Sequence, residues 1–211
     1  MNKIKAIVFD MDGVLIDAKD WHYEALNKAL NLFGYEISRH DHLTTFDGLP
    51  TRVKLEMLSV ERGLPRKLHD FISSMKQIYT MQMVASKCKP IFQHEYALSK
   101  LKSKGYKLGL ASNAVRNSVE AMMEKSNLIQ YLDSVISNED VEKPKPDPEI
   151  YLQSMKELGV GPKEMMILED NDHGIKAARA SGGFVMEIDT IQDVHLENIM
   201  QHLSSFERED K

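Results

Sequence analysis

The stretch IVFDMDGVLID, residues 7–17, decides how this sequence folds. It continues an apolar, β-branched run that begins at Ile4 and stops at Asp10, which is typical of a strand buried on both faces of a parallel sheet. Asp10 and Asp12 leave the end of that strand, and Gly13 follows. Carboxyl ends of strands form the ligand crevice of open α/β sheets, and clustered carboxylates there favour Mg²⁺. The tetrapeptide alone is equally consistent with a plain turn, because Asp and Gly are ordinary turn residues.

Four further short apolar runs are similar to that first strand, and helical patterns lie between most of them. They are Lys107–Ala111, Ser134–Ile136, Met165–Leu168 and Phe184–Ile188. This alternation predicts an α/β fold with a three-layer, Rossmann-like core, a mostly parallel sheet and right-handed crossovers. Asp147, followed by Pro148 and Glu149, predicts the N-cap of a helix that Gly159 ends.

Residues 18–87 interrupt the alternation with helical patterns and no convincing strand. The first predicted helix has Trp21, Ala25, Ala29 and Phe33 on a shared face and ends at Gly34. The second has Thr51 as its cap and runs through Glu61 to a stop at Gly63, and the third runs from about Pro65 to Val84. About 70 helical residues are too many for a simple crossover. We therefore predict an inserted helical cap at residues 17–88 and an α/β core at residues 1–16 and 89–211.

The composition excludes several classes of protein. The 211 residues are 42% hydrophobic with a formal net charge of −5, which argues against disorder and against the positive charge of a nucleic-acid-binding domain. Cys88 is the only cysteine, so no intramolecular disulfide can form, which fits a reducing compartment. No apolar run approaches the roughly 18 residues of a membrane span, and no signal-peptide cleavage site follows the first run. We expect a cytoplasmic monomer that binds neither nucleic acid nor membrane.

Residues 7–17 resemble the first motif of the haloacid dehalogenase superfamily, whose members are mostly aspartate-based phosphotransferases. Three other stretches resemble its remaining motifs, in order. Leu110–Asn113 resembles the second, a Ser or Thr at a strand end; Lys143–Tyr151 resembles the third, a lysine before a helix; and Ile167–Ile175 resembles the fourth, acidic residues after a strand. The resemblance covers essentially the whole chain, and four ordered motifs make chance agreement improbable.

The resemblance assigns the chemistry to carboxylates. It implies that Asp10 attacks phosphorus to form an aspartyl-phosphate, while Asp12 protonates the leaving oxygen and later deprotonates the attacking water or hydroxyl. It implies Mg²⁺ between Asp10 and a phosphate oxygen, held also by the Asp12 backbone carbonyl, by Asp170 and, directly or through water, by Glu169. Dehalogenases and phosphonate-cleaving members lack an acid/base aspartate two residues after the nucleophile, so Asp12 points to phosphate esters.

The resemblance also implies groups that hold the transferring phosphoryl group. These are Ser112, the backbone amide of Asn113 and a lysine. Lys143 and Lys145 both precede a proline; alignment with the family's helix start favours Lys145 and leaves Lys143 as a solvated loop charge. In the fourth motif, Asp172 and His173 are expected to be loop and capping residues.

The helical insertion resembles the small cap of the subfamily that contains β-phosphoglucomutase and many sugar-phosphate phosphatases. His22 is similar to the family's cap histidine, and Gly48 to Arg52 resemble its specificity loop. Arg52 would hold a distal phosphate or carboxylate, and Lys76 would serve the same anion. For each of these substrate-binding candidates an ordinary surface role stays open. His40–His42 are expected to form a solvated loop.

The resemblance thus implies Mg²⁺-dependent hydrolysis of a small phosphorylated metabolite, with a sugar phosphate expected. A β-phosphoglucomutase-like phosphomutase would use the same residues and differ only in whether water or a sugar hydroxyl receives the phosphoryl group. A non-enzymatic phospho-receiver or regulatory module is the alternative outside enzymes. Receiver domains, however, carry their phosphoaccepting Asp on a later strand and lack a helical insertion of this size.

Overall fold

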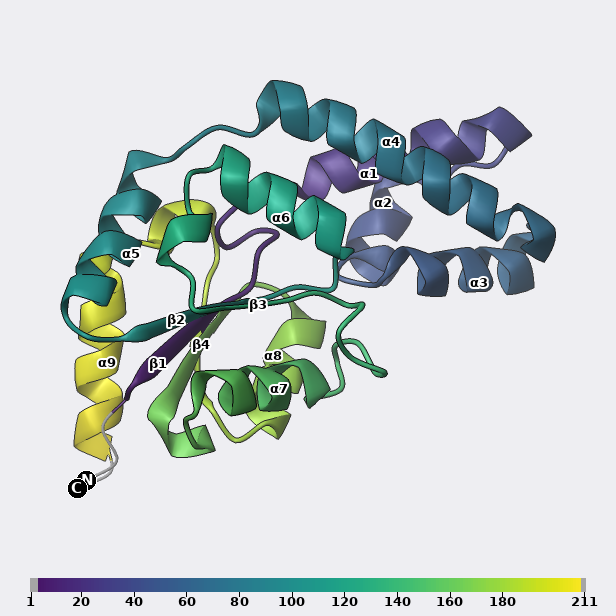
Figure 1. Cartoon of the computed structure of the whole chain (residues 1–211). Helices are drawn as coiled ribbons and strands as arrows, with labels where there is room; N and C mark the ends of the chain where they lie inside the picture. Colours follow the sequence, from purple (N-terminus) through teal and green to yellow (C-terminus); the bar gives the residue numbers. More distant parts are fainter. Residues whose placement is uncertain (1–3, 210–211) are drawn as a thin grey trace. The chain divides into compact units, whose positions relative to one another are not determined.

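The computed structural model describes residues 4–209, with side chains up to Phe206, and the chain forms two compact units. The α/β unit takes in the chain up to Asp17 and from Lys89 onward, and the helical unit is Ala18–Cys88. Figure 1 shows the sheet with its flanking helices, and the helices α1 to α4 of the helical unit. None of the described helices is long and apolar enough to cross a membrane.

The α/β unit is built on one five-stranded sheet with the order β3-β2-β1-β4-β5, and every strand pair is parallel. The strands are β1 (Ala6–Phe9), β2 (Lys107–Ala111), β3 (Ser134–Ile136), β4 (Met165–Glu169) and β5 (Phe184–Glu187). All residues of β1 and β4 are buried, which explains why the sequence shows apolar runs there instead of alternation. The predicted fold class is confirmed.

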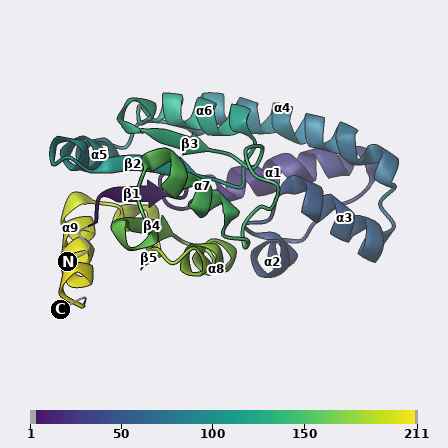
Figure 2. The ribbon, with the colours of Figure 1, turned by 60° about the horizontal axis from the view of Figure 1, so that its bottom comes forward.

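Helices cover both faces of this sheet and complete three layers. They are α5 (Phe92–Ser103), α6 (Arg116–Lys125), α7 (Glu149–Leu158), α8 (Asp172–Ala180) and α9 (Leu196–Glu209), with 3₁₀ turns at Ile129–Tyr131, Pro162–Glu164 and Ile191–Asp193. Helices α7 and α8 lie together on one face, and α5, α6 and α9 lie on the other (Figures 1 and 2). For α5 to α8 this division follows from right-handed crossovers, because the chain leaves β1 toward β3 and then returns through β4 to β5, whereas α9 follows the last strand and belongs to no crossover. Tyr151 of α7 is the largest side chain in the apolar layer beneath α7 and α8.

The helical unit contains α1 (Lys19–Leu30), α2 (Arg39–Asp41), a π-helical turn (His42–Phe46), α3 (Thr51–Arg62) and α4 (His69–Lys87), with 3₁₀ turns at Asn31–Phe33 and Arg66–Leu68. Its core is apolar and includes Leu26, Leu30, Phe46, Leu55, Leu58 and Ile72.

The predicted helix boundaries in this unit need three corrections. The helix expected from Pro65 begins with a 3₁₀ turn, closed by the Leu68 N–H on the Pro65 carbonyl at 2.9 Å, and α4 starts only at His69. Thr51 is the first residue of α3 and not its cap, because Pro50 occupies the cap position in an extended conformation. Phe33 lies beyond α1 in a 3₁₀ turn and is partly exposed, so it does not share the buried face of Ala25.

The expectation of a solvated loop at His40–His42 is wrong for His42. The Ser38 hydroxyl accepts the Asp41 N–H at 3.0 Å, and this N-cap starts a helical turn where the polar sequence indicated a loop. His42 follows, only 3% exposed, with its ring centroid 4.9 Å from that of Tyr23. A buried imidazole thus belongs to the interior of the helical unit.

Acidification should destabilise the protein through His42. Burial, helped by the nearby Lys54 ammonium, lowers the pKa of His42 from 6.5 to about 4. The unfolded chain takes up a proton near pH 6.5 while folded His42 stays neutral, so the free energy of unfolding falls as the pH drops from 6.5 toward about 4. We expect a loss of about 1–2 kcal/mol, less than the full shift implies because solvent screens part of it.

Urea unfolding at several pH values in this window measures that loss. His42→Gln should flatten the pH dependence, and the exposed neighbour His40 provides a matched control variant, His40→Gln. Equal pH dependence in the wild type and both variants would contradict this assignment.

Candidate active site

The register of the sheet brings the predicted reactive residues to one level. Phe9 pairs with Leu110 on one side and with Leu168 on the other. The residues that follow these strand positions, among them Asp10 and Glu169, therefore emerge side by side at the carboxyl edge of the sheet. The Asp10 N–H still bonds the Leu168 carbonyl at 3.0 Å, so the backbone of the aspartate is held by the sheet.

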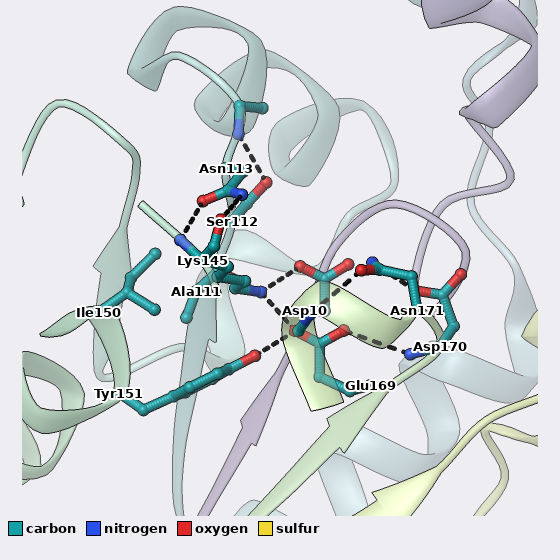
Figure 3. A network of polar contacts seen from close by, with 12 residues as sticks. Asp10, Ala111, Ser112, Asn113, Lys145, Ile150, Tyr151, Glu169, Asp170 and Asn171 are labelled. Atoms are coloured by element: carbon teal, nitrogen blue, oxygen red, sulfur yellow. Dashed lines mark hydrogen bonds and ion pairs between the residues drawn. The ribbon is translucent and has the colours of Figure 1, made fainter. Parts of the chain in front are cut away.

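Lys145 occupies the centre of this edge. Its Nζ donates to Asp10 Oδ1 at 2.6 Å, to Glu169 Oε1 at 2.6 Å and to the Ala111 carbonyl at 2.9 Å (Figure 3). Lys145 is 2% exposed, whereas Lys143 is exposed, so the structure brings Lys145 to the cluster and not Lys143. An ammonium has three N–H bonds, and all three are used here. A phosphate oxygen could bind this ammonium only by replacing one of these partners.

Burial dominates the electrostatics of the cluster. Desolvation raises the pKa of Asp10 well above its usual range, against the opposing effect of the Lys145 ammonium. For Lys145, burial alone would lower the pKa, but the Asp10 and Glu169 carboxylates outweigh burial and raise it. The carboxyl groups around Lys145 therefore favour its charged form.

The carboxylates of the cluster suit a divalent metal ion. Asp10, Glu169 and Asp170 each offer an oxygen, and these oxygens lie within 4.8 Å of one another. If all three were ionised beside one lysine, two negative charges would be left uncompensated at this largely buried edge, and a bound cation would offset the burial that raises the pKa of Asp10. An all-oxygen donor set with this charge fits a hard cation such as Mg²⁺. Asp12 is half-buried in the loop after β1, and its side chain is not part of this set.

Sequence reasoning missed Tyr151, which lies inside the third motif. It is fully buried in α7, its hydroxyl donates to Glu169 Oε1, and its ring centroid is 5.0 Å from Lys145 Nζ. Burial raises the pKa of the Tyr151 phenol well above its usual range, so the hydroxyl keeps its proton and can donate. The sequence offered one signal for this residue: a tyrosine, with a polar hydroxyl, on the face of α7 that is buried and mostly apolar.

The helix that follows the acidic pair leaves room for Glu169. Its N-cap is Asn171, whose side chain accepts the Gly174 N–H at 3.1 Å, so Asp172 and His173 are helical residues and not the caps expected from the sequence. Asn is a favoured cap because its side-chain carbonyl oxygen reaches the N–H three residues on. A Cβ at Gly174 would lie 2.0 Å from the Glu169 carboxylate, so only glycine fits there.

Gly174→Ala should therefore destabilise the protein although alanine favours helices by about 1 kcal/mol. The added methyl must displace a buried carboxylate that Lys145 and Tyr151 hold, and we expect a net loss of about 2–4 kcal/mol in the free energy of unfolding. Urea unfolding measures this loss. Gly161→Ala is the control, because the nearest atom to a Cβ there is Glu164 Oε2 at 3.7 Å. A Gly174→Ala protein as stable as the wild type would show that Glu169 is not confined.

Ser112 and Asn113 stand at the end of β2. Ser112 is buried, and its hydroxyl accepts the Ala114 N–H at 3.1 Å. The Asn113 side chain bonds the main chain of Lys145. The cap of α7 differs from the prediction by one residue: Pro148 is the N-cap, and Asp147 Oδ1 instead accepts the Glu149 N–H at 3.1 Å.

The cap candidates lie in the helical unit. His22 of α1 and Lys76 of α4 are brought together, with Nδ1 and Nζ 3.3 Å apart. Gly48 has a positive φ of 69° in the turn before α3, which favours glycine, and Arg52 is exposed on the first turn of α3. The roles of these four residues toward a substrate stay predictions.

Fold and site together define an α/β enzyme with carboxylates and a lysine at the carboxyl ends of its central strands. The sequence model of the family of haloacid dehalogenase-like hydrolases matches residues 7–188. This chain therefore belongs to that family, as the sequence motifs predicted.

Relatives in this family carry names of phosphatases. A phosphorylated carbohydrates phosphatase of Thermotoga maritima is 28% identical over 85% of this chain and 82% of its own length. A phosphoglycolate phosphatase of Aquifex aeolicus is 29% identical over the same shares. Among solved structures, a β-phosphoglucomutase from Clostridium difficile has the same fold, with a TM-score of 0.84, 22% identity and coverage of 97% of this chain and 99% of that one.

Proposed function

We propose that this protein is a Mg²⁺-dependent phosphatase that hydrolyses a small phosphorylated metabolite through an aspartyl-phosphate on Asp10. One observation carries the proposal. The buried Asp10 carboxylate has Oδ1 fixed by Lys145 at 2.6 Å and lies beside the carboxylates of Glu169 and Asp170. This arrangement holds a nucleophile in one orientation at the crevice of the sheet.

In the first half-reaction a carboxylate oxygen of Asp10 attacks phosphorus, and the bond from phosphorus to the ester oxygen breaks. Asp12 donates a proton to that oxygen, which leaves as an alcohol. Ser112 and backbone N–H groups at the end of β2 would hold the phosphoryl oxygens. In the second half-reaction Asp12 accepts a proton from water, which attacks phosphorus, releases orthophosphate and restores Asp10.

Asp10, Glu169 and Asp170 would hold the metal ion, with the Asp12 backbone carbonyl. When bound, the ion supplies positive charge that lessens the repulsion between an anionic nucleophile and an anionic substrate. Lys145 keeps Asp10 oriented and keeps part of the carboxylate charge compensated at every stage.

The substrate we propose is a sugar phosphate or a similar small anion. Support comes from the name of the Thermotoga maritima relative and from the cations Arg52 and Lys76 of the helical unit. A guanidinium binds a distal phosphate or carboxylate by two parallel hydrogen bonds, which would give preference for doubly anionic substrates.

Product analysis on a panel of phosphorylated sugars and small acids tests this proposal. The panel contains β-glucose 1-phosphate with a trace of the bisphosphate, each reaction is run with Mg²⁺ and with chelator, and Asp10→Asn is the blank. Release of orthophosphate from one or a few compounds, lost with chelator, is the expected result. Glucose 6-phosphate without matching orthophosphate would instead identify a phosphomutase, and no turnover on any compound would reject the proposal.

A further inference from the structure

The side chain of Asn113 holds the main chain of Lys145. The Lys145 N–H donates to Asn113 Oδ1 at 3.1 Å, and Asn113 Nδ2 donates to the Lys145 carbonyl oxygen at 3.3 Å (Figure 3). One carboxamide thus satisfies both main-chain polar groups of a residue that lies 32 positions away in the sequence.

The other end of Lys145 is bonded to the same strand end. Lys145 Nζ donates to the carbonyl of Ala111, two residues before Asn113, at 2.9 Å. The lysine therefore reaches from a main-chain attachment at Asn113 to an ammonium attachment at Ala111. Near Lys145 the other hydrogen bonds of the loop are local, such as those from the N–H groups of Glu142 and Lys143 to Glu149. The loop is also tied to the segment after β2 at its beginning, where the Asn138 N–H donates to the Ala114 carbonyl at 3.1 Å, but that bond lies seven residues before Lys145.

We propose that Asn113 is a positioning residue, which fixes the Lys145 ammonium between Asp10 and Glu169 by holding the lysine main chain against the end of β2. A lysine side chain is a flexible four-carbon chain, so the place of its ammonium depends on where its Cα is held. An error of about 1 Å at a reacting group is costly to catalysis. This role belongs to the Asn113 carboxamide and adds to any part that its backbone plays toward substrate.

The helical unit contains the same arrangement. Asn27 of α1 accepts the Ile37 N–H and donates to the Ile37 carbonyl, both at 2.8 Å. In both units an asparagine fixes a connecting segment by bonding the donor and acceptor of one residue.

The inference rests on the proposed function, and a kinetic double-mutant cycle tests it. Asn113→Ala should lower kcat/KM by about 10- to 100-fold in the wild type but by less than about 3-fold in Lys145→Met, because a residue that acts only through Lys145 has nothing left to position there. Asn117→Ala, an exposed asparagine in α6, should leave kcat/KM unchanged. Equal losses in both backgrounds would overturn the proposal and assign Asn113 directly to the substrate.

Asn113→Asp separates the two hydrogen bonds. It keeps the acceptor for the Lys145 N–H but places an oxygen against the Lys145 carbonyl, where the amide group donates. We expect it to lose at least as much activity as Asn113→Ala, and again only when Lys145 is present. Wild-type activity in Asn113→Asp would overturn the two-bond arrangement.

Hydrogen exchange of the Lys145 amide gives a readout that needs no turnover. Its exchange rate should rise at least about 10-fold in Asn113→Ala and stay unchanged in Asn117→Ala, because only the former removes its acceptor. Unchanged exchange in Asn113→Ala would overturn the proposal. An inactive wild type would reject the proposed function. In that case two measurements without turnover decide whether Asn113 holds Lys145: the exchange rate of the Lys145 amide, and the double-mutant cycle of Asn113→Ala and Lys145→Met with the unfolding equilibrium constant in place of kcat/KM.

Discussion

Asp10→Asn should abolish turnover, with a loss of at least about 10⁴-fold in kcat, while the protein stays folded. The amide keeps the volume of the carboxylate but is no nucleophile toward phosphorus, and no other described carboxylate has the same place at the end of β1. Burial works against the ionised form of Asp10, so the neutral amide removes a desolvation cost at the same time as it weakens the pair with Lys145. These effects on stability oppose one another, and circular dichroism should show a native spectrum.

The covalent step can be seen directly. Wild-type protein quenched in acid during turnover should carry the mass of one phosphoryl group on the peptide that contains Asp10, and Asp10→Asn should not. Asp189→Asn, at an exposed aspartate, is the matched control and should keep both activity and adduct. Substantial turnover by pure Asp10→Asn, or an adduct on another peptide, would rule out Asp10 as the nucleophile.

The sheet and the residues at its carboxyl edge were accessible to sequence reasoning for a physical reason. Strands buried on both faces must be apolar throughout, so runs such as residues 4–9 and 165–168 stand out from a helical background. Carboxylates placed directly after two such runs must then meet at one edge, because parallel strands end at the same level. The pairing of Phe9 with Leu168 is the structural form of that argument.

The residues that hold those reactive groups in place could not be predicted in the same way. Tyr151, Gly174 and the carboxamide of Asn113 act through particular tertiary contacts, with the Glu169 carboxylate or with the main chain of Lys145, and no periodicity in the sequence reports such contacts. Tyr151 has the spacing of an ordinary core residue of α7, and the role of its hydroxyl becomes visible only in the structure, where it donates a hydrogen bond to Glu169. The prediction for His42 was wrong for a related reason. The polar sequence around it indicated an exposed loop, whereas the cap at Ser38 starts a helical turn and His42, which follows that turn, is buried.

Lys145→Met should lower both the activity and the stability of the protein, whereas Lys143→Met should change neither much. Removal of the ammonium leaves Asp10 and Glu169 buried without their cation, and loss of one partner of a buried ion pair typically costs about 3–5 kcal/mol. Misplacement of the Asp10 carboxylate adds a kinetic effect, which we expect to be about 10³-fold in kcat/KM. Methionine keeps an unbranched side chain of similar length, so packing against Tyr151 is largely retained.

Lys143→Met is the matched control, because both lysines precede a proline in the same loop while only Lys143 is exposed. It should change the free energy of unfolding by less than about 0.5 kcal/mol. Urea unfolding in the presence of chelator measures stability, and a repeat with Mg²⁺ adds a second test. A bound cation would compensate the carboxylates that Lys145→Met leaves behind, so Mg²⁺ should stabilise this variant more than the wild type. Similar losses in the two variants would place the functional cation elsewhere, and Lys145→Met with wild-type stability would show that the buried carboxylates are neutral without it.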